Sequence, residues 1–433
     1  MMTEVCLLND SFPPEIDGVS NAVVNYARVI KNEGYGVSVV TPEYPGSDDS
    51  AFDYPVIRYP ALDLRETIGY TAGNPFSLPT LLELNRRDIG ILHSHCPMMS
   101  NMMARSLREA LDVPLVMTYH TKFDIDIANV IKLKGMQHSA IKALVESVSA
   151  CDELWVVSDG AGKNIRKLGY QGDYIVMPNG VDMPRHTASE CEIAAAVEGY
   201  DLPFGVPVFL FVGRLMWYKG IRIILDALAA LKHQGFDFRM VFVGSGGDEA
   251  EIRQCVEELQ LGDRVIFTGA IKDRNILAAW YSRADLLLFP STFDTNGLVV
   301  REAAACSLGA VLVDGSCAAE GVTDGVDGLL IQENAACLAV CLACVMGSRR
   351  AMGEIGENAS RNLYYSWDAS VHNAIERYGV VKENYRSGSG KKHRRLTDEL
   401  FVLSGELVSL ITEAEEHRRE LGERLEERLE RYQ

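Results

Sequence analysis

The stretch Pro290-Ser-Thr-Phe-Asp-Thr-Asn-Gly-Leu-Val-Val-Arg-Glu-Ala-Ala-Ala305 decides the fold class of this chain, because it joins a strand to a helix. The apolar run at 284–289 before it is typical of a buried parallel strand. From Val299 to Ala305 the residues follow a helical pattern. The loop between them lies at the carboxyl end of the strand, where open α/β sheets bind ligands. The free amides and the dipole at the start of the helix favour an anion there.

Two acids in this stretch, Asp294 and Glu302, stand eight positions apart with Gly297 between them. Asp294 belongs to the predicted loop, and Glu302 lies about one turn into the predicted helix. One hypothesis is that one acid faces a polar, hydroxyl-rich ligand while the other holds a second part of it. The alternative is an ordinary helix with an acid in its first turns, which is common. The stretch alone does not decide between them.

Length and charge restrict the classes of protein. A chain of 433 residues is too long for one ordinary core, so two domains and an extension are expected. The formal net charge of −18 argues against a nucleic-acid binder but leaves a local basic patch on a membrane open. The first residues lack the basic region of a signal peptide, and the ten cysteines lack the spacing of a secreted scaffold. We therefore expect a cytoplasmic protein with reduced thiols.

Strands and helices alternate along most of the chain, which predicts two parallel-sheet domains. The alternation weakens in an acid- and alanine-rich segment from Met183 to Gly205, where we place the domain boundary. Two such domains facing each other across a cleft are a common setting for a ligand site. Gly18, at the first strand-to-helix turn, permits close approach of a ligand to the backbone. No GxGxxG motif is present, so a nicotinamide dinucleotide fold is not supported.

Two cations and one histidine follow predicted strands. Arg214 and Lys219 come after the apolar run 208–212, and a pair of cations at a strand end suits a pyrophosphate. The alternative is a solvated surface pair. His120 follows a strand and would act as a base, a hydrogen-bond donor or an acceptor anchor, although a lone histidine is usually structural. The pattern Asp124-Ile-Asp126 occurs often by chance, and we predict no metal site from it.

The end of the chain has a different character. Residues 386–395 form a basic linker, and leucines beyond it recur at steps of three and four. This pattern at 396–433 predicts an amphipathic helix that either forms a coiled-coil homodimer or packs back on the body of the protein. A membrane-surface helix is a third interpretation, because basic residues precede the apolar positions.

Several segments in one order resemble the retaining GT-B glycosyltransferases of family 4, over about residues 1–385. They are Pro13–Val19, Tyr119–Phe123, Val156–Ser158 with Pro178–Asp182, Val212–Gly220, Phe267–Ala270, and the acids Asp294 and Glu302. The resemblance implies an α/β fold of the GT-B type, with two Rossmann-like parallel-sheet domains facing a cleft and a C-terminal amphipathic or coiled-coil helix. It implies an acceptor-binding domain at 1–184, a nucleotide-sugar-binding domain at 185–366, and a helix at 367–385 that crosses back to the N-terminal domain.

The resemblance also implies roles for single residues. Arg214 and Lys219 would neutralise the donor diphosphate. Glu302 would hold the ribose, and Asp294 the donor sugar or the charge at its anomeric carbon. His120 would contact the transferred sugar or the acceptor. The implied catalytic residues are His120, Asp294, Arg214 and Lys219, and the implied donor-binding residues are Gly18, Arg214, Lys219, Ile271, Asp294, Asn296, Gly297, Leu298, Val299 and Glu302. The resemblance implies no metal or other cofactor. It also implies a front-face attack with the leaving phosphate as the base, so that no protein nucleophile is needed.

Substrates follow from the details of the resemblance. Asp294 stands where the family usually has Glu, which puts the identity of the donor sugar in doubt; a UDP-sugar is favoured. The loops around Gly18 and His120 are most like those of enzymes that glycosylate diacylglycerol or other lipids at the cytoplasmic membrane face. Residues 131–148, with Lys132, Lys134 and Lys142, would then form a peripheral membrane contact, or else an ordinary surface helix. A soluble or polysaccharide acceptor, and a non-catalytic scaffold acting through the C-terminal helix, are the alternatives.

Overall fold

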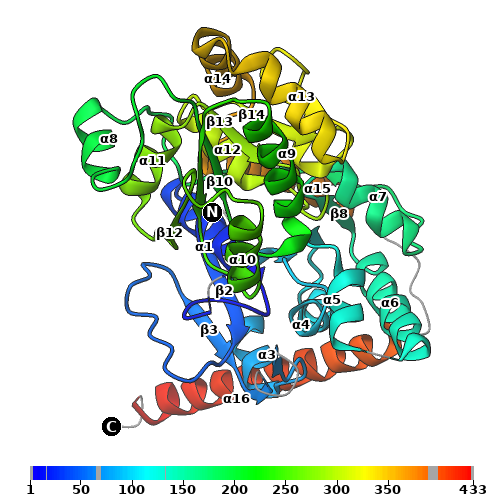
Figure 1. Cartoon of the computed structure of the whole chain (residues 1–433). Coiled ribbons are helices and arrows are strands. Elements are labelled where there is room, and N and C mark those ends of the chain that lie inside the picture. The colour runs from blue at the N-terminus through cyan, green and yellow to red at the C-terminus, as the bar shows by residue number, and fades with distance from the viewer. Residues whose placement is uncertain (1–2, 16, 65–69, 132, 389–397, 431–433) are drawn as a thin grey trace. The chain divides into compact units, whose positions relative to one another are not determined.

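The computed structural model describes residues 3–15, 17–64, 70–131, 133–388 and 398–430 (Figure 1). The chain divides into two compact units. Unit 1 comprises Met1–Val157, Ala161–Met177 and Val371–Gln433, and unit 2 comprises Ser158–Gly160 and Pro178–Ser370. The continuous part of unit 2 runs from Pro178 to Ser370, whereas the sequence predicted a domain at 185–366.

Unit 1 contains a parallel sheet of seven strands in the order β3-β2-β1-β6-β7-β8-β9, and a separate two-stranded sheet, β4-β5. The parallel strands are buried runs rich in Val, Leu and Ile, as expected for a sheet covered by helices on both faces. The elements up to the end of the sheet are β1 (Glu4–Leu8), α1 (Gly18–Asn32), β2 (Val37–Pro42), β3 (Val56–Tyr59), β4 (Ala61–Leu64), β5 (Tyr70–Gly73), α3 (Leu78–Asn85), β6 (Ile89–Ser94), α4 (Met99–Leu111), β7 (Leu115–Tyr119), α5 (Phe123–Val130), α6 (Lys134–Ser149), β8 (Glu153–Val156), α7 (Asp159–Lys167) and β9 (Ile175–Val176).

Unit 2 contains a parallel sheet of six strands in the order β12-β11-β10-β13-β14-β15. This is the doubly wound order, in which the chain builds outward from β10 and then returns to build outward from β13 on its other side. The elements are α8 (Glu190–Ala196), β10 (Val208–Val212), η1 (Trp217–Lys219), α9 (Ile221–His233), β11 (Arg239–Val243), α10 (Glu249–Glu258), β12 (Val265–Gly269), α11 (Arg274–Arg283), β13 (Leu286–Phe289), α12 (Leu298–Ala305), β14 (Ala310–Val313), η2 (Cys317–Ala319), β15 (Leu329–Ile331), α13 (Ala335–Val345) and α14 (Arg349–Asn362).

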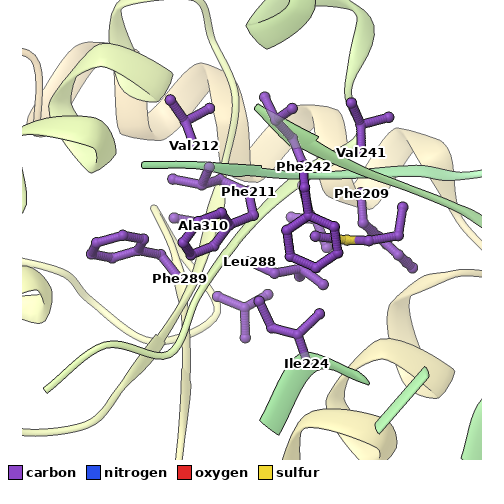
Figure 2. Packing of buried hydrophobic residues seen from close by; sticks show 14 of the residues in the cluster. Phe209, Phe211, Val212, Ile224, Val241, Phe242, Leu288, Phe289 and Ala310 are labelled. Carbon is purple, nitrogen blue, oxygen red and sulfur yellow. The ribbon is translucent and has the colours of Figure 1, made fainter. Parts of the chain in front are cut away.

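Aromatic side chains fill the core of unit 2 around β10 (Figure 2). The ring of Phe211 lies 5.6 Å from that of Phe242 on β11 and 6.0 Å from that of Phe289 on β13, centroid to centroid. Strands β10 and β13 pair directly, with Phe209 opposite Leu286. A close-packed interior of this kind holds the carboxyl ends of β10 and β13 in fixed positions.

Helix α15 (Trp367–Arg386) begins in unit 2 and belongs to unit 1 from Val371 onward, whereas the sequence predicted a helix at 367–385 that crosses back to the N-terminal domain. Within unit 1, the ring of Tyr378 stacks on Trp155 at 5.3 Å and its hydroxyl lies 2.6 Å from Nδ1 of His93. Arg377 forms an ion pair with Glu153 at 2.6 Å. These contacts fix the C-terminal half of α15 against β6 and β8.

The last helix, α16 (Glu399–Glu430), lies against α4 and α3 (Figure 1). The guanidinium of Arg105 pairs with Asp398 and sits 3.8 Å from the ring centroid of Phe401. A Cβ on Gly405 would come within 2.7 Å of the Cβ of Glu109, so the two helices approach closely at a residue without a side chain. Of the interpretations open for this segment, the structure has the helix packed on the body. Most of the predicted linker, residues 389–395 of 386–395, lies outside the described residues.

One local feature differs from the sequence-based expectation. Helix α1 begins at Gly18, which the sequence placed at the turn before the helix, because the Asp17 carboxylate accepts hydrogen bonds from the amides of Val19 and Ser20 at 2.8 and 2.7 Å. Gly18 is therefore the first residue of a capped helix and not part of the preceding loop.

No single helix of the described chain has the length and apolar composition to cross a membrane, although α13 and α14 pass such a test together as a pair bent by 108°. Leu338 and Leu342 of α13 are buried in the core of unit 2.

Candidate active site

The carboxyl ends of β10 and β13 form the point of unit 2 where the strand order reverses, which is where doubly wound sheets bind ligands. The loop 213–220 follows β10, and the loop 290–297 follows β13. The two loops are in direct contact, since a Cβ on Gly220 would lie 2.2 Å from the carbonyl oxygen of Pro290. Gly220 also has φ of +78°, so two independent reasons require glycine there.

Lys219 and Asp294 meet across this contact. The Nζ atom of Lys219 lies 2.6 Å from Oδ1 of Asp294, and the Ser291 hydroxyl donates to Oδ2 at 2.6 Å. Lys219 is buried, and the ring centroids of Tyr218 and Phe293 lie 5.7 and 5.8 Å from its Nζ atom. The resemblance implied that Asp294 binds the donor sugar. In the structure both of its carboxylate oxygens already have partners in the two loops, Lys219 and Ser291.

Arg214 differs from Lys219 although it belongs to the same loop. It is exposed, and its guanidinium forms no hydrogen bond or ion pair with any residue of the described chain. The backbone around it is fixed, because Leu215 donates to the Ser245 carbonyl at 3.1 Å and a Cβ on Gly246 would lie 2.2 Å from the Leu215 carbonyl oxygen. Arg214 thus presents an unpaired cation from a rigid loop, as an anion site requires.

The N-terminus of α12 follows the second loop. Its cap residue, Gly297, has φ of +59°, and a Cβ there would lie 2.8 Å from the Cα of Ala318. No side chain caps this helix. The Asn296 Nδ2 and Ser316 Oγ atoms are buried and have no hydrogen-bond partner within the described part of the chain. Uncapped helix amides and unsatisfied buried polar atoms are the groups that a polar or anionic ligand satisfies.

Glu302, one turn into α12, is held by two side chains of α11. Its Oε1 atom lies 2.9 Å from Nη1 of Arg274, and its Oε2 atom accepts a hydrogen bond from the hydroxyl of Tyr281 at 2.9 Å. Burial, together with the charge of Glu302, raises the pKa of Tyr281 well above its usual range, so its hydroxyl keeps the proton that it donates. Sequence reasoning missed both partners. Their spacing of seven residues, two turns on one helix face, is the signal that could have found them.

Ile271 lies just before α11, in the loop that follows β12. Its side chain is half-buried and packs against the core of unit 2. Asp273 caps α11, accepting from the amide of Asn275 at 2.8 Å. Ile271, predicted to bind the donor, therefore lies in the loop that leads directly to Arg274 at the start of α11.

His120 of unit 1 follows β7 and is buried beside another histidine. Its Nε2 atom lies 2.9 Å from Nδ1 of His95. Burial lowers the pKa of His120 to about 3, and it lowers those of His93 and His95 well below their usual range, so all three are neutral. No group of three or more His, Cys, Asp or Glu among the residues that the structure describes is arranged to hold a metal ion.

The remaining predicted residues are also in unit 1. Gly18 is exposed at the start of α1, and a Cβ there would meet no atom within 4 Å. Asp124 accepts a hydrogen bond from Asn164 at 3.2 Å, whereas the side chain of Asp126 lies outside the described part. Around the start of α6, Leu133 and Met136 are 66% and 57% exposed, and Lys134 and Lys142 are exposed too. Lys132 lies outside the described residues.

Two family models match the chain. The model of the glycosyl transferases group 1 matches residues 198–360, and that of Glycosyltransferase Family 4 matches residues 16–185. The matches fall on the two parallel sheets and together span most of the chain.

Curated relatives are glycosyltransferases. The alpha-monoglucosyldiacylglycerol synthase of Acholeplasma laidlawii is 22% identical over 338 residues, which are 76% of this chain and 84% of that protein. A GDP-mannose-dependent alpha-(1-6)-phosphatidylinositol dimannoside mannosyltransferase of Mycobacterium tuberculosis is 29% identical over 268 residues, 62% of this chain and 68% of that protein.

Solved structures share the fold. The sucrose-phosphate synthase of Thermosynechococcus elongatus superposes with a TM-score of 0.71 at 22% identity, covering 88% of this chain and 99% of that one. HepE of Anabaena in complex with UDP-glucose superposes with a TM-score of 0.69 at 17% identity, covering 87% of this chain and 100% of that one. At these identities the likeness concerns the fold, which confirms the expected GT-B class. From the two family matches and this shared fold, the chain belongs to the glycosyltransferases of family 4 and is a transferase enzyme.

Proposed function

We propose that this glycosyltransferase moves a sugar from a UDP-sugar to a hydroxyl group of a lipid acceptor, with retention of the anomeric configuration. The observation that carries the proposal is the cluster at the carboxyl ends of β10 and β13. It combines the unpaired Arg214, the buried Lys219–Asp294 pair and the uncapped start of α12. Cations and free amides gathered at one switch point suit the diphosphate of a nucleotide sugar.

The two cations would have different tasks. Arg214 would bind the diphosphate through its planar fork, which suits two phosphate oxygens at once. Lys219 is buried and oriented by Asp294, so it supplies a fixed charge that needs no reorganisation when the diphosphate leaves. These charges would stabilise the departing nucleoside diphosphate. We propose that the reaction needs no metal or other cofactor, and transfer that persists in EDTA is the expected result.

Glu302 would bind the ribose hydroxyls of the donor. Each of its oxygens accepts one hydrogen bond in the structure, and a carboxylate has about four acceptor positions. Arg274 and Tyr281 therefore fix the carboxylate and leave acceptor capacity for ribose. Ile271 would contribute backbone contacts to the base from the preceding loop.

The sugar would be held mainly by groups at the start of α12. The amides of Leu298 and Val299 and the amide group of Asn296 are the proposed donors at the start of α12. Asp294 orients Lys219 and would contact the sugar only through acceptor positions that Lys219 and Ser291 leave free. With the leaving phosphate as base, no protein nucleophile is needed for a front-face attack.

The proposed roles in unit 1 concern the backbone and a neutral imidazole. Gly18 would allow a phosphate near the start of α1, and the carboxylate of Asp17 already caps that helix. A phosphate there would have to share or displace this cap. His120 is neutral, so it would contact the transferred sugar or the acceptor through hydrogen bonds and not through charge.

Lipid is the favoured acceptor. The relative from Acholeplasma laidlawii is by name an alpha-monoglucosyldiacylglycerol synthase, and the mycobacterial relative is by name a phosphatidylinositol dimannoside mannosyltransferase. The exposed Leu133 and Met136 beside Lys134 and Lys142 provide apolar and basic groups for a peripheral contact with the cytoplasmic face of a membrane. The competing donor is GDP-mannose, which the name of the mycobacterial relative includes.

A transfer assay tests the proposal. Purified full-length protein is mixed with vesicles containing diacylglycerol and with UDP-glucose or GDP-mannose, and lipid products are identified by mass spectrometry. A glycolipid formed from UDP-glucose in the presence of EDTA is expected. Glycosylation of soluble glycans alone would replace the lipid acceptor, and the absence of transfer from any donor to any acceptor would leave the scaffold alternative.

A further inference from the structure

Helix α16 presents two opposite apolar faces. The inner face consists of Phe401, Gly405, Val408 and Thr412, which are buried or in close contact with α4 and α3. The outer face consists of Leu400, Leu403, Leu407 and Leu410, which are 57%, 63%, 51% and 64% exposed. Scattered exposed leucines are normal on a protein surface, but a contiguous row of them marks an interaction site.

The spacing of the outer face has the heptad form. Steps of three, four and three residues place Leu400 and Leu407 at a positions and Leu403 and Leu410 at d positions. In this frame Gly405 and Thr412 occupy f positions, which lie diametrically opposite the a and d seam. The contact with α4 and α3 therefore uses the side of α16 away from the seam, and both faces can be occupied at once. Beyond Leu410 the next a positions hold Ala414 and Leu421 and the next d position holds His417, so the leucine seam runs from Leu400 to Leu410.

Charges beside the seam favour another protein helix over a membrane. Glu399, Glu406 and Glu413 occupy g positions, and they would be repelled by the anionic surface of a membrane. The facing e positions hold Ser404, Ile411 and Arg418.

These charges also favour one direction of pairing. In a parallel pair of α16 helices, a g residue faces the e residue of the next heptad in the other copy. Glu413 would then face Arg418 of the second copy, and Glu399 and Glu406 would face Ser404 and Ile411. An antiparallel pair would instead bring g positions together and place glutamates against glutamates.

We propose that two copies of this chain associate through a parallel coiled coil formed by the outer faces of their α16 helices, while each inner face stays on its own unit 1. The interface is isologous, because the same four leucines serve both copies. The parallel direction places the two bodies on opposite sides of the seam, since each body lies at the f side of its helix. This inference concerns unit 1 alone and stands or falls independently of the transfer reaction.

The first test measures the mass of the full-length protein in solution by light scattering at micromolar concentration. The wild type is expected at twice the mass of one chain, and the double variant Leu403→Asp/Leu407→Asp at the mass of one chain. Leu62→Asp is the matched control, because Leu62 is a 70% exposed leucine elsewhere in unit 1 and its substitution should leave the dimer unchanged. A fourfold variant with alanine at the outer leucines removes the seam without adding charge. Equal thermal midpoints would show that the variants remain folded.

The second test fixes the direction of pairing. In a background in which the exposed Cys191 and Cys344 are replaced by serine, Leu403→Cys or Leu410→Cys should form a disulfide between copies on mild oxidation, whereas Leu62→Cys should not. A monomeric wild type, a Leu403→Asp/Leu407→Asp variant that stays dimeric, or cysteines at d positions that do not cross-link would each overturn the proposal. If the wild type is a monomer that binds anionic vesicles, and changing the outer leucines abolishes that binding, then the outer face of α16 binds a membrane and not a second copy.

Discussion

Lys219 and Asp294 lie in loops after neighbouring strands and form an ion pair with an Nζ–Oδ1 distance of 2.6 Å. This contact gives a physical role to the aspartate at a position where the family usually has glutamate. The shorter carboxylate bridges the Lys219 ammonium and the Ser291 hydroxyl inside the two loops. A glutamate, longer by one methylene, would have to reach past these groups. We infer that the main role of Asp294 is to orient the Lys219 cation, and that contact with the sugar is a secondary role.

The first prediction concerns stability. Asp294→Ala removes the partner of a buried ammonium and should lower the free energy of unfolding by about 3 kcal/mol, at the lower end of the range for a broken buried pair because the Asp294 side chain is 22% exposed. Urea unfolding measures this change. The double variant Lys219→Met/Asp294→Ala should recover most of the loss, since no uncompensated charge remains. An Asp294→Ala protein as stable as the wild type would show that the pair is not effectively buried.

The second prediction concerns the unpaired guanidinium. Arg214→Ala should lower kcat by about 100- to 1,000-fold, the usual effect of removing one electrostatic donor from a developing charge. Steady-state kinetics with the donor nucleotide sugar measure it. Arg222→Ala is the control, because Arg222 is an exposed arginine of α9 paired with Asp226, and its loss should leave kcat unchanged. Equal kcat in Arg214→Ala and wild type would remove Arg214 from the site.

The third prediction concerns the two residues that hold Glu302. Arg274→Ala should raise the Kd for the donor nucleotide about tenfold, because the carboxylate loses a charged hydrogen bond that fixes it for ribose. Tyr281→Phe should act in the same direction. Isothermal titration with UDP measures both, and Arg253→Ala on α10, whose arginine pairs with Glu249, serves as the control. Tighter binding by Arg274→Ala would mean that Arg274 competes with ribose for Glu302.

Much of this arrangement follows from the sequence, and the part that does not depends on which elements are neighbours in space. The apolar runs predicted the strands, and Arg214, Lys219 and Asp294 were placed at strand ends on that basis. Pairing between Lys219 and Asp294 was not predicted, because it depends on β10 and β13 being neighbours in the sheet although they are distant in the chain.

Helix faces were the other source of error. A heptad pattern in α16 predicts one apolar seam, and it does not show that residues between the leucines, such as Gly405, pack on another helix. The hydrogen bonds from Arg274 and Tyr281 of α11 to Glu302 were not predicted for the same reason. The face that a helix buries depends on its neighbours in space. Gly18 was taken as a loop residue because the capping role of Asp17 was not recognised.

The fourth prediction concerns pH. Burial lowers the pKa of His120 from 6.5 to about 3, so between these values the unfolded chain binds a proton that the folded chain does not. The free energy of unfolding should therefore fall as the pH drops below 6.5, by up to about 1.4 kcal/mol per pH unit for each such histidine. Urea unfolding at several pH values measures the slope.

His120→Asn should make this slope less steep, because the variant lacks one of the groups that titrate only on unfolding. His138→Asn is the control, since His138 is exposed and its replacement should leave the slope as in the wild type. The same slope in His120→Asn and in the wild type would count against a buried, neutral His120.

The central claim is that the cluster at the ends of β10 and β13 binds the diphosphate of a nucleotide sugar and promotes its departure. The most direct measurement is acceptor-dependent release of UDP from UDP-glucose by the purified full-length protein in diacylglycerol vesicles, with Arg214→Ala and Arg222→Ala side by side. We predict that the wild type and Arg222→Ala release UDP at similar rates. Arg214→Ala should release it at least about 100-fold more slowly. Equal release by all three proteins, or none from any nucleotide sugar, would contradict the claim.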